Sequence, residues 1–221
     1  MNAHLGRVAR ATAFAICCAQ ATVAHAKPIA FAHGTTVMAE YGAGTMTEAQ
    51  VFYAPTFRYS VGGGHLSLNS SENDDTRDIT YLRLNYLPKR WNLEAAQANV
   101  FVWGSAGRAH IGETGENELA WNVGGQLDYE TRRLYGSFRT DLHEAKDYSH
   151  RIDTLQLGVA PYKHDYQTLA VWFVVQGRQY TGGLYDRTEW AALLRLFKRN
   201  VWVEAGATHE GNLQAMLMIN F

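Results

Sequence analysis

The segment Leu213–Phe221 alternates strictly between two kinds of side chain. Every second residue, from Leu213 to Phe221, is apolar, and the residues between them are Gln214, Met216, Met218 and Asn220. A period of two places successive side chains on opposite faces of a strand, whereas a helix would mix the two sets. The segment therefore predicts a β-strand with one fully apolar face.

A terminal Phe that closes such an alternation resembles the C-terminal signature of Gram-negative outer-membrane β-barrel proteins. The resemblance is to that broad class and to no single family. It implies that the protein resides in the outer membrane, in contact with its lipid, and that the barrel-assembly machinery recognises one apolar row. That row is Leu213, Ala215, Leu217, Ile219 and Phe221.

The N-terminal residues have the layout of an export signal. Arg7 and Arg10 precede an apolar run, Ala11–Ala24, which ends in an Ala-x-Ala site at Ala26. A membrane-spanning helix would need about 20 apolar residues, more than this run supplies. We therefore expect residues 1–26 to be a cleaved signal peptide and residues 27–221 to form a single barrel domain. Both cysteines of the chain lie within the signal, so the mature chain has no disulfide.

Charge and hydropathy exclude two further classes of protein. The chain has 20 Lys and Arg against 21 Asp and Glu, and losing the signal leaves 18 against 21. Without a basic excess, no nucleic-acid partner is expected. No run of about 18 apolar residues follows Lys27, so membrane-spanning helices are not predicted. A soluble periplasmic protein and an outer-membrane barrel remain.

From Gly34 onward, short alternating segments are separated by clusters of Gly, Asn, Asp and Pro. This pattern predicts an all-β fold, a transmembrane antiparallel up-and-down barrel of about twelve strands, or ten if two weak segments fail. A soluble β-sandwich is the competing fold. The expected strands are 36–41, 50–61, 65–70, 79–87, 95–103, 119–129, 134–142, 152–160, 167–177, 188–197, 201–208 and 213–221.

The connections between these segments alternate between short and long, as a barrel with periplasmic turns and exterior loops requires. A glycine turn is expected at 62–64, and Pro88 is expected to end a strand. A two-residue hairpin at Thr131 and Arg132 would pair Tyr129 with Leu134. The terminal strand would pair with 201–208 and close the barrel onto 36–41.

Aromatic residues are expected to gather at the two membrane interfaces. The periplasmic set is Trp91, Tyr129, Tyr162, Phe197, Trp202 and Phe221, and the outer set is Tyr41, Trp103, Trp121, Tyr180 and Trp190.

The polar faces of the strands would line the interior of the barrel. The charged residues expected there are Glu40, Arg58, Arg83, Asp128, Arg139, Arg195 and Glu204. One interpretation is a structural barrel plugged by buried ion pairs. The other is a pore in which the four arginines line a path for small polar or anionic solutes.

Two other functions have weaker signals. Ser149 and His150 suggest a lipid-modifying hydrolase, but adjacent strand residues point to opposite faces, so no catalytic residue is assigned. The mature chain keeps seven histidines, which raises a copper- or zinc-handling role. No pair of these histidines has ligand spacing within one element, so neither a metal site nor a cofactor is predicted.

Overall fold

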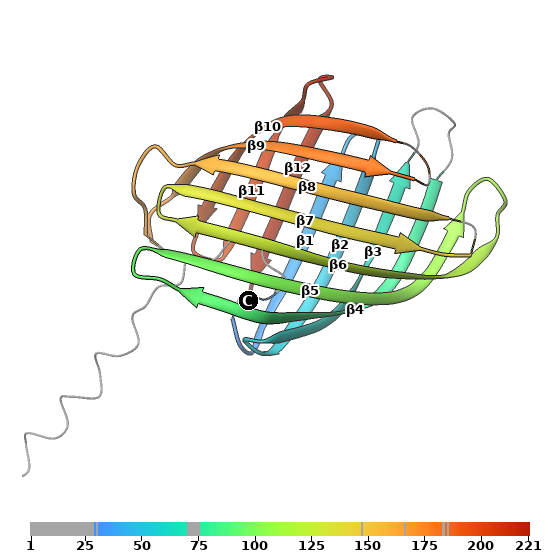
Figure 1. Cartoon of the computed structure of the whole chain (residues 1–221), viewed down its shortest axis with the longest axis horizontal. Coiled ribbons are helices and arrows are strands. Elements are labelled where there is room, and N and C mark those ends of the chain that lie inside the picture. Colours follow the sequence, from blue (N-terminus) through green and yellow to red (C-terminus); the bar gives the residue numbers. More distant parts are fainter. Residues whose placement is uncertain are drawn as a thin grey trace, which may run out of the picture.

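A computed structural model of the 221-residue chain describes residues 29, 31–69, 76–146, 148–165, 167–182, 184 and 186–221. The described residues form twelve antiparallel strands in one closed barrel (Figure 1). The strands are β1 (Gly34–Gly42), β2 (Met46–Thr56), β3 (Tyr59–Asn69), β4 (Thr76–Asn92), β5 (Ala96–Ile111), β6 (Asn117–Thr131), β7 (Leu134–Glu144), β8 (Ser149–Val159), β9 (Ala170–Thr181), β10 (Arg187–Lys198), β11 (Val201–Thr208) and β12 (Leu213–Asn220). Each strand pairs with its neighbours in sequence, and β1 pairs with β12. The predicted twelve-stranded up-and-down barrel is confirmed.

The sequence predicted a cleaved signal peptide and no membrane-spanning helix. The predicted signal peptide, residues 1–26, lies outside the described residues. None of the residues that the structure does describe forms a helix with the length and apolar character needed to cross a membrane.

The barrel closes at the segment that the sequence marks most clearly. β12 pairs with β11 on one side and with β1 on the other, as predicted, and Ala39 lies opposite Leu217. Phe221 extends this pairing, because its N–H donates to the Thr35 carbonyl at 2.8 Å and its carbonyl accepts from the Thr35 N–H at 3.0 Å. The last residue of the chain is therefore part of the seam.

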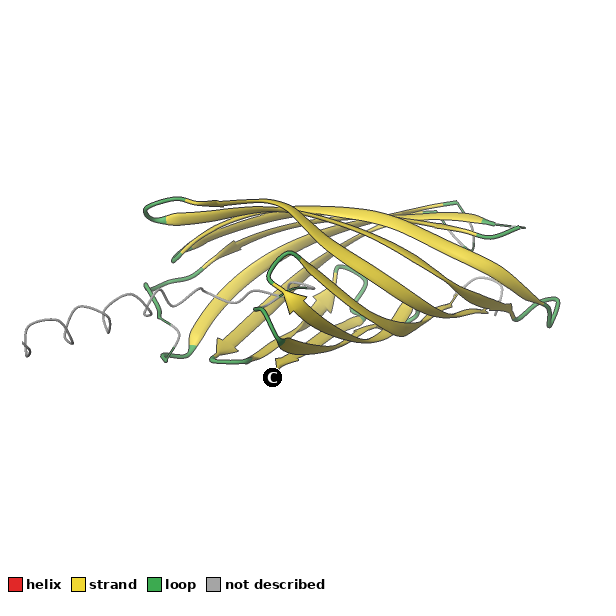
Figure 2. Ribbon diagram, turned by 90° about the horizontal axis from the view of Figure 1, so that it is seen from below, coloured by secondary structure: helices red, strands yellow, loops and turns green. Residues whose placement is uncertain are grey.

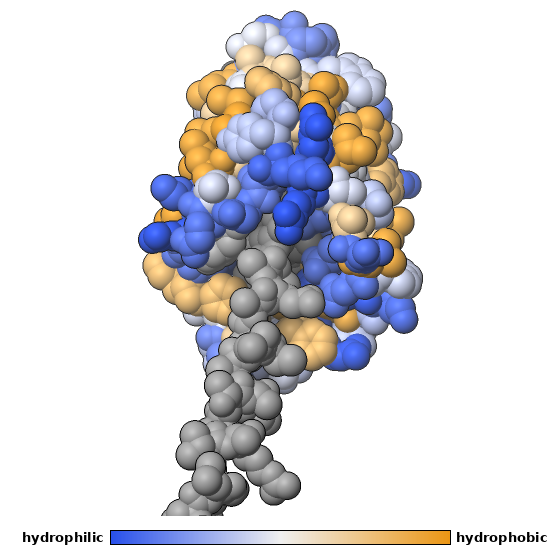
Figure 3. Space-filling view, turned by 90° about the vertical axis from the view of Figure 1, so that its left-hand side faces the viewer, coloured by the Kyte–Doolittle hydropathy of each residue, from blue (hydrophilic) through white to orange (hydrophobic). Residues whose placement is uncertain are grey.

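Alternation along the strands separates the two faces of the wall. Large apolar side chains point outward, and Leu82 and Leu119 are 74% and 78% exposed. Figure 3, which looks onto one end of the barrel, shows hydrophobic patches on the flanks and hydrophilic side chains at this end. Large exposed apolar side chains occur on many strands of this wall, from Val37 on β1 to Leu217 on β12.

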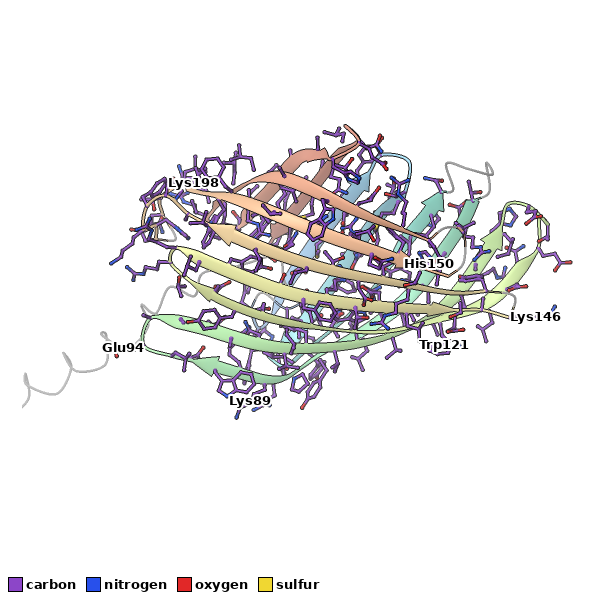
Figure 4. All side chains as sticks on the ribbon, turned by 45° about the horizontal axis from the view of Figure 1, so that its top comes forward. Lys89, Glu94, Trp121, Lys146, His150 and Lys198 are labelled. Atoms are coloured by element: carbon purple, nitrogen blue, oxygen red, sulfur yellow. The ribbon has the colours of Figure 1, made fainter. Side chains whose placement is uncertain are left out.

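The connections divide between the two ends of the barrel. Turns of two or three residues, at 57–58, 93–95, 132–133 and 199–200, share one end with the chain terminus. Figure 4 labels Glu94 and Lys198 at this turn end and Lys146 at the opposite, loop end. The exception is the connection 160–169, which is the longest and nevertheless lies at the turn end.

The connection 160–169 carries a buried histidine, His164, whose ring meets Trp172 edge-on at 5.3 Å between centroids. Burial lowers the pKa of His164, although Glu130 and Asp165 nearby favour its charged form and Arg132 opposes it. The neutral ring is thus the form that packs here. Stability from this contact is present above the ordinary pKa of histidine, about 6.5, and is lost as the pH falls through the lowered value.

Acidification is therefore expected to release this connection. The protection factors of the amides in residues 160–169, which are corrected for the slower intrinsic exchange in acid, should be lower at pH 5 than at pH 7.5, and a His164→Phe variant should show no such change. The exposed His209, at the other end of the barrel, provides the control, because His209→Phe should leave the pH dependence intact. Equal protection factors at the two pH values in the wild type would contradict the prediction.

The structure corrects the predicted strand 50–61. A hairpin at Phe57 and Arg58 divides it, with the Thr56 hydroxyl accepting from the Arg58 N–H at 3.2 Å. The predicted glycine turn at 62–64 lies inside β3 instead. A Cβ at Gly62 would lie 1.9 Å from the carbonyl oxygen of Val51 on β2, so this glycine lets two strands approach closely.

Pro88 does not end its strand. β4 continues to Asn92, and its pairing with β5 shifts between Tyr86 and Lys89. Such a bulge tolerates proline because one residue leaves the hydrogen-bonded ladder. The connection between the predicted strands 95–103 and 119–129 is likewise much shorter, because β5 runs to Ile111 and β6 begins at Asn117.

The predicted hairpin register near residue 131 is wrong by two residues. The loop is Arg132 and Arg133, and Tyr129 pairs with Gly136 instead of Leu134. The Thr131 hydroxyl fixes this turn by accepting from the N–H groups of Arg133 and Leu134. A shift of two keeps every side chain on its face, so matching apolar with apolar could not reveal the error.

Four of the predicted interface aromatics face the interior. They are Trp103, Tyr180, Phe197 and Trp202, all buried. The two tryptophans have inward partners for their indole N–H groups: Trp103 donates to Asp141 at 2.7 Å and Trp202 to Glu204 at 2.9 Å. The N–H group of a tryptophan favours an interior position when a hydrogen-bond acceptor is present there. Outward aromatics, among them Trp121 and Tyr129, are exposed as expected.

Candidate functional site

The interior of the barrel contains a belt of paired charges between an apolar cluster at the loop end and apolar clusters at the turn end. Met46, Leu68 and Tyr148 belong to the first, and Phe197 and Met218 to one of the second. Four inward arginines in the belt each lie beside a carboxylate. The pairs are Arg83 with Glu48, Arg139 with Asp141, Arg178 with Glu40, and Arg195 with Glu204.

Arg195 is the most enclosed of these cations. Its side chain is 1% exposed and lies 3.0 Å from the Glu204 carboxylate. Its guanidinium carbon is 4.4 Å from the ring centroids of both Tyr135 and Trp202. The cation is therefore held by one ion pair and two aromatic faces, which together compensate for the loss of water.

Trp103 organises a second group of charges. Arg83 and Arg139 approach its ring, at 5.9 and 5.3 Å from the centroid, and its N–H donates to Asp141. The indole packs against Gly124, where a Cβ would lie 2.4 Å from the indole nitrogen. Gly124 therefore gives the indole the space it needs to reach Asp141.

The Arg178–Glu40 ion pair crosses the lumen. It joins β9 to β1, which are separated around the wall by three strands, β10, β11 and β12. Figure 2 shows the walls facing each other across a narrow interior. The tight cross-section explains how single side chains bridge it.

Two cavities lie on either side of this ion pair. The larger has a volume of about 90 Å³, and the smaller, towards the loop end, about 20 Å³. Both are lined by Glu40, Arg139, Thr154 and Arg178, so the two cavities adjoin at these four residues. A water molecule needs about 10–15 Å³, so the larger cavity has room for several and the smaller for about one.

A chain of amides borders the larger cavity. Arg195 donates to Gln156 at 2.8 Å, Gln156 to Gln176 at 2.8 Å, and Gln176 to Gln214 at 2.7 Å. Gln214 in turn lies 3.4 Å from the Glu189 carboxylate. Gln156, Gln176 and Gln214 are called the glutamine chain below.

The structure places six of the seven predicted charged residues on the inward faces of strands. Arg83, Arg139, Arg195, Glu40 and Glu204 belong to the belt, whereas Asp128 accepts separately from Asn99 at 2.6 Å. Arg58 is not an interior residue. The hairpin that divides β2 from β3 places it in an exposed turn, with its guanidinium 5.3 Å from the Phe57 ring centroid.

Sequence reasoning missed Glu48 and Arg178, two members of the belt. Glu48 precedes the predicted start of a strand at residue 50, and Arg178 follows a predicted end at residue 177. Both real strands are longer, β2 beginning at Met46 and β9 ending at Thr181. Extending each alternation by one pair of residues would have found both, because they have the parity of the inward face.

The residues of the alternative functions lie apart. Ser149 points outward and donates to Glu144 at 2.6 Å, whereas His150 is buried and stacks on Tyr180. They cannot act as a catalytic pair. His143 lies opposite His150 on the neighbouring strand, facing the interior. Among the described side chains, no three His, Cys, Asp or Glu residues come together as metal ligands.

Comparisons with known proteins give few matches. No protein-family model and no curated protein matches the chain. One similar solved structure is described as "KdgM porin", with 9% identity, a TM-score of 0.45, and coverage of 85% of this chain and 98% of that one. Another, described as "Unveiling the Mechanism Behind the in-meso Crystallization of Membrane Proteins", has 13% identity, a TM-score of 0.40, and coverage of 86% and 83%.

Proposed function

We propose that this chain is an outer-membrane barrel protein that forms a gated pore for small polar solutes, and that the lumen is closed in the present conformation. The apolar outer wall supports a place in lipid. The row Leu213, Ala215, Leu217, Ile219 and Phe221, on the outer side of the closing strand, is where we place the contact with the barrel-assembly machinery.

One observation carries the pore: two polar cavities follow each other in the lumen and meet at the Arg178–Glu40 pair. In a barrel that was filled only for stability, apolar side chains would stabilise the interior better than ion pairs. The free energy needed to desolvate an ion pair is about as large as the attraction between its charges. Charged side chains that line successive cavities are instead typical of pathways for polar solutes.

The pair Arg178–Glu40 is the proposed gate. Shortening both side chains, in the double variant Arg178→Ser and Glu40→Ser, should join the two cavities and raise the single-channel conductance at least about twofold. Recordings from purified full-length protein in planar lipid bilayers would measure this. Removing both charges together avoids leaving one ion buried alone.

A matched control removes the same charges from the outer surface. Arg151 and Asp153 form an exposed ion pair at 2.9 Å on the outward face of β8, and changing both to Ser should leave the conductance unchanged. A gate variant that conducts no better than the wild type, while its barrel is folded, would contradict the assignment of the gate.

A purely structural barrel is the second candidate. The observation in its favour is that each of the four belt arginines already has a carboxylate partner. It predicts that neither the wild type nor the gate variant produces conductance steps under any applied voltage.

A further inference from the structure

We propose that the larger cavity is a binding site for uncharged polyhydroxyl solutes, such as short polyols and small sugars, and that the glutamine chain recognises their hydroxyl groups. This inference rests on the proposed pore and names the class of solute that its lumen accepts.

The charges around the cavity disfavour ions. Two carboxylates and two guanidinium groups line it, namely Glu40, Glu204, Arg139 and Arg178. Glu40 pairs with Arg178, Glu204 with Arg195, and Arg139 with Asp141. An entering anion or cation would have to compete with a partner already in place and leave another buried charge uncompensated. A neutral solute disturbs none of these pairs.

The amides of the glutamine chain do not use all of their hydrogen-bonding groups. An amide side chain carries two N–H donors and an oxygen with two lone pairs. Within the described residues, the hydrogen bonds of Gln156, Gln176 and Gln214 use one N–H and one lone pair of each amide. Each amide therefore keeps one donor and one acceptor. A hydroxyl group, which both donates and accepts, matches this combination.

The remainder of the cavity wall suits the carbon skeleton of such a solute. Ser137 and Thr154 add hydroxyl groups, while Met38, Leu193 and Met216 provide an apolar side. Tyr135 also lines the cavity. The wall therefore offers both polar groups for the hydroxyls and an apolar surface for the carbon atoms of a small solute.

Matched solutes test the inference. Ribitol is neutral and ribonate is an anion of the same carbon number. Saturation-transfer NMR on the detergent-solubilised full chain should detect ribitol and not ribonate, and liposomes containing the protein should admit ribitol at least about fivefold faster, the effect of roughly one hydrogen bond. Equal signals for the two solutes, or a preference for ribonate, would overturn the inference.

The two measurements separate failure of the pore from failure of the site. Ribitol binding without liposome swelling would retain the binding site and reject the pore. Swelling without a preference for ribitol would retain the pore and reject the proposed solute class. Absence of both binding and swelling would reject both.

Two variants of Gln176 connect the effect to the glutamine chain. Gln176→Leu removes the central amide and should abolish the ribitol signal, while Gln179→Leu, an outward position on the same strand, should preserve it. Because Gln176→Leu could impair folding, Gln176→Met keeps the length of the side chain without adding a buried charge and should weaken ribitol binding at least about fivefold through the lost hydrogen-bonding groups. Wild-type binding by the folded Gln176→Leu or Gln176→Met protein would contradict the assignment.

Discussion

Replacing Arg195 with alanine is expected to lower the free energy of unfolding by about 3–5 kcal/mol, because Glu204 would remain as a buried charge without its partner. The pair is almost fully enclosed, with side chains 1% and 4% exposed. Loss of the contacts with Tyr135 and Trp202 would add to the effect. Urea unfolding of the barrel in lipid vesicles, followed by tryptophan fluorescence, would measure the change.

Two further variants serve as controls for this prediction. Arg151→Ala removes an arginine from an ion pair near the start of β8, at the loop end of the barrel, and should cost less than about 1 kcal/mol, since water screens an exposed pair there. Combining Arg195→Met with Glu204→Gln removes both buried charges and should restore most of the stability. If Arg195→Ala were no more harmful than Arg151→Ala, the belt would not contribute to stability in the way described.

Replacing Gly107 with alanine is expected to be nearly as damaging. A Cβ at Gly107 would lie 2.0 Å from the Thr80 carbonyl oxygen and 2.6 Å from the Tyr81 Cα, on the neighbouring strand β4. Both are backbone atoms, so no side-chain rotation relieves the overlap. We expect a loss of more than about 2 kcal/mol, because β4 and β5 would have to move apart.

The same strand offers the control. A Cβ at Gly104 would have its nearest contact at 3.9 Å, so Gly104→Ala should change the free energy of unfolding by no more than about 0.5 kcal/mol. Heat-modifiable gel migration would compare the folded fractions of the two variants. Equal folded fractions would show that the two strands can separate at Gly107 without cost.

The sequence predicted the architecture because alternation has a direct physical cause. Successive strand residues face opposite sides of the wall, so the alternation in Leu213–Phe221 and in the other strands shows which side chains point outward. The number of strands and the closure of the terminal strand onto β1 followed from this pattern. The residues at which one strand ends and the next begins were harder to predict. A run of three glycines resembles a turn, and only the approach of Val51 in the folded barrel shows why Gly62 lies within a strand.

The interior was predictable only in part, for a different reason. Parity assigned Glu40, Arg83 and Arg195 to the inward face, yet it does not say which side chains meet across the lumen. Glu40 and Arg178 are 138 positions apart in the chain. Their contact depends on the stagger of the strands around the closed barrel, and an error of two residues in one hairpin would change every such distance.

The hydrogen bonds along the glutamine chain also have a polarity. The chain starts at the guanidinium of Arg195, which can only donate, and ends at the carboxylate of Glu189, which in its ionised form can only accept. Reversing any one amide would place donor against donor at one neighbour and acceptor against acceptor at the other. The two charged ends therefore hold all three amides in one sense of rotation, and the lumen presents a fixed, chiral arrangement of donors and acceptors. The two enantiomers of a sugar are therefore expected to bind to this wall with different affinities.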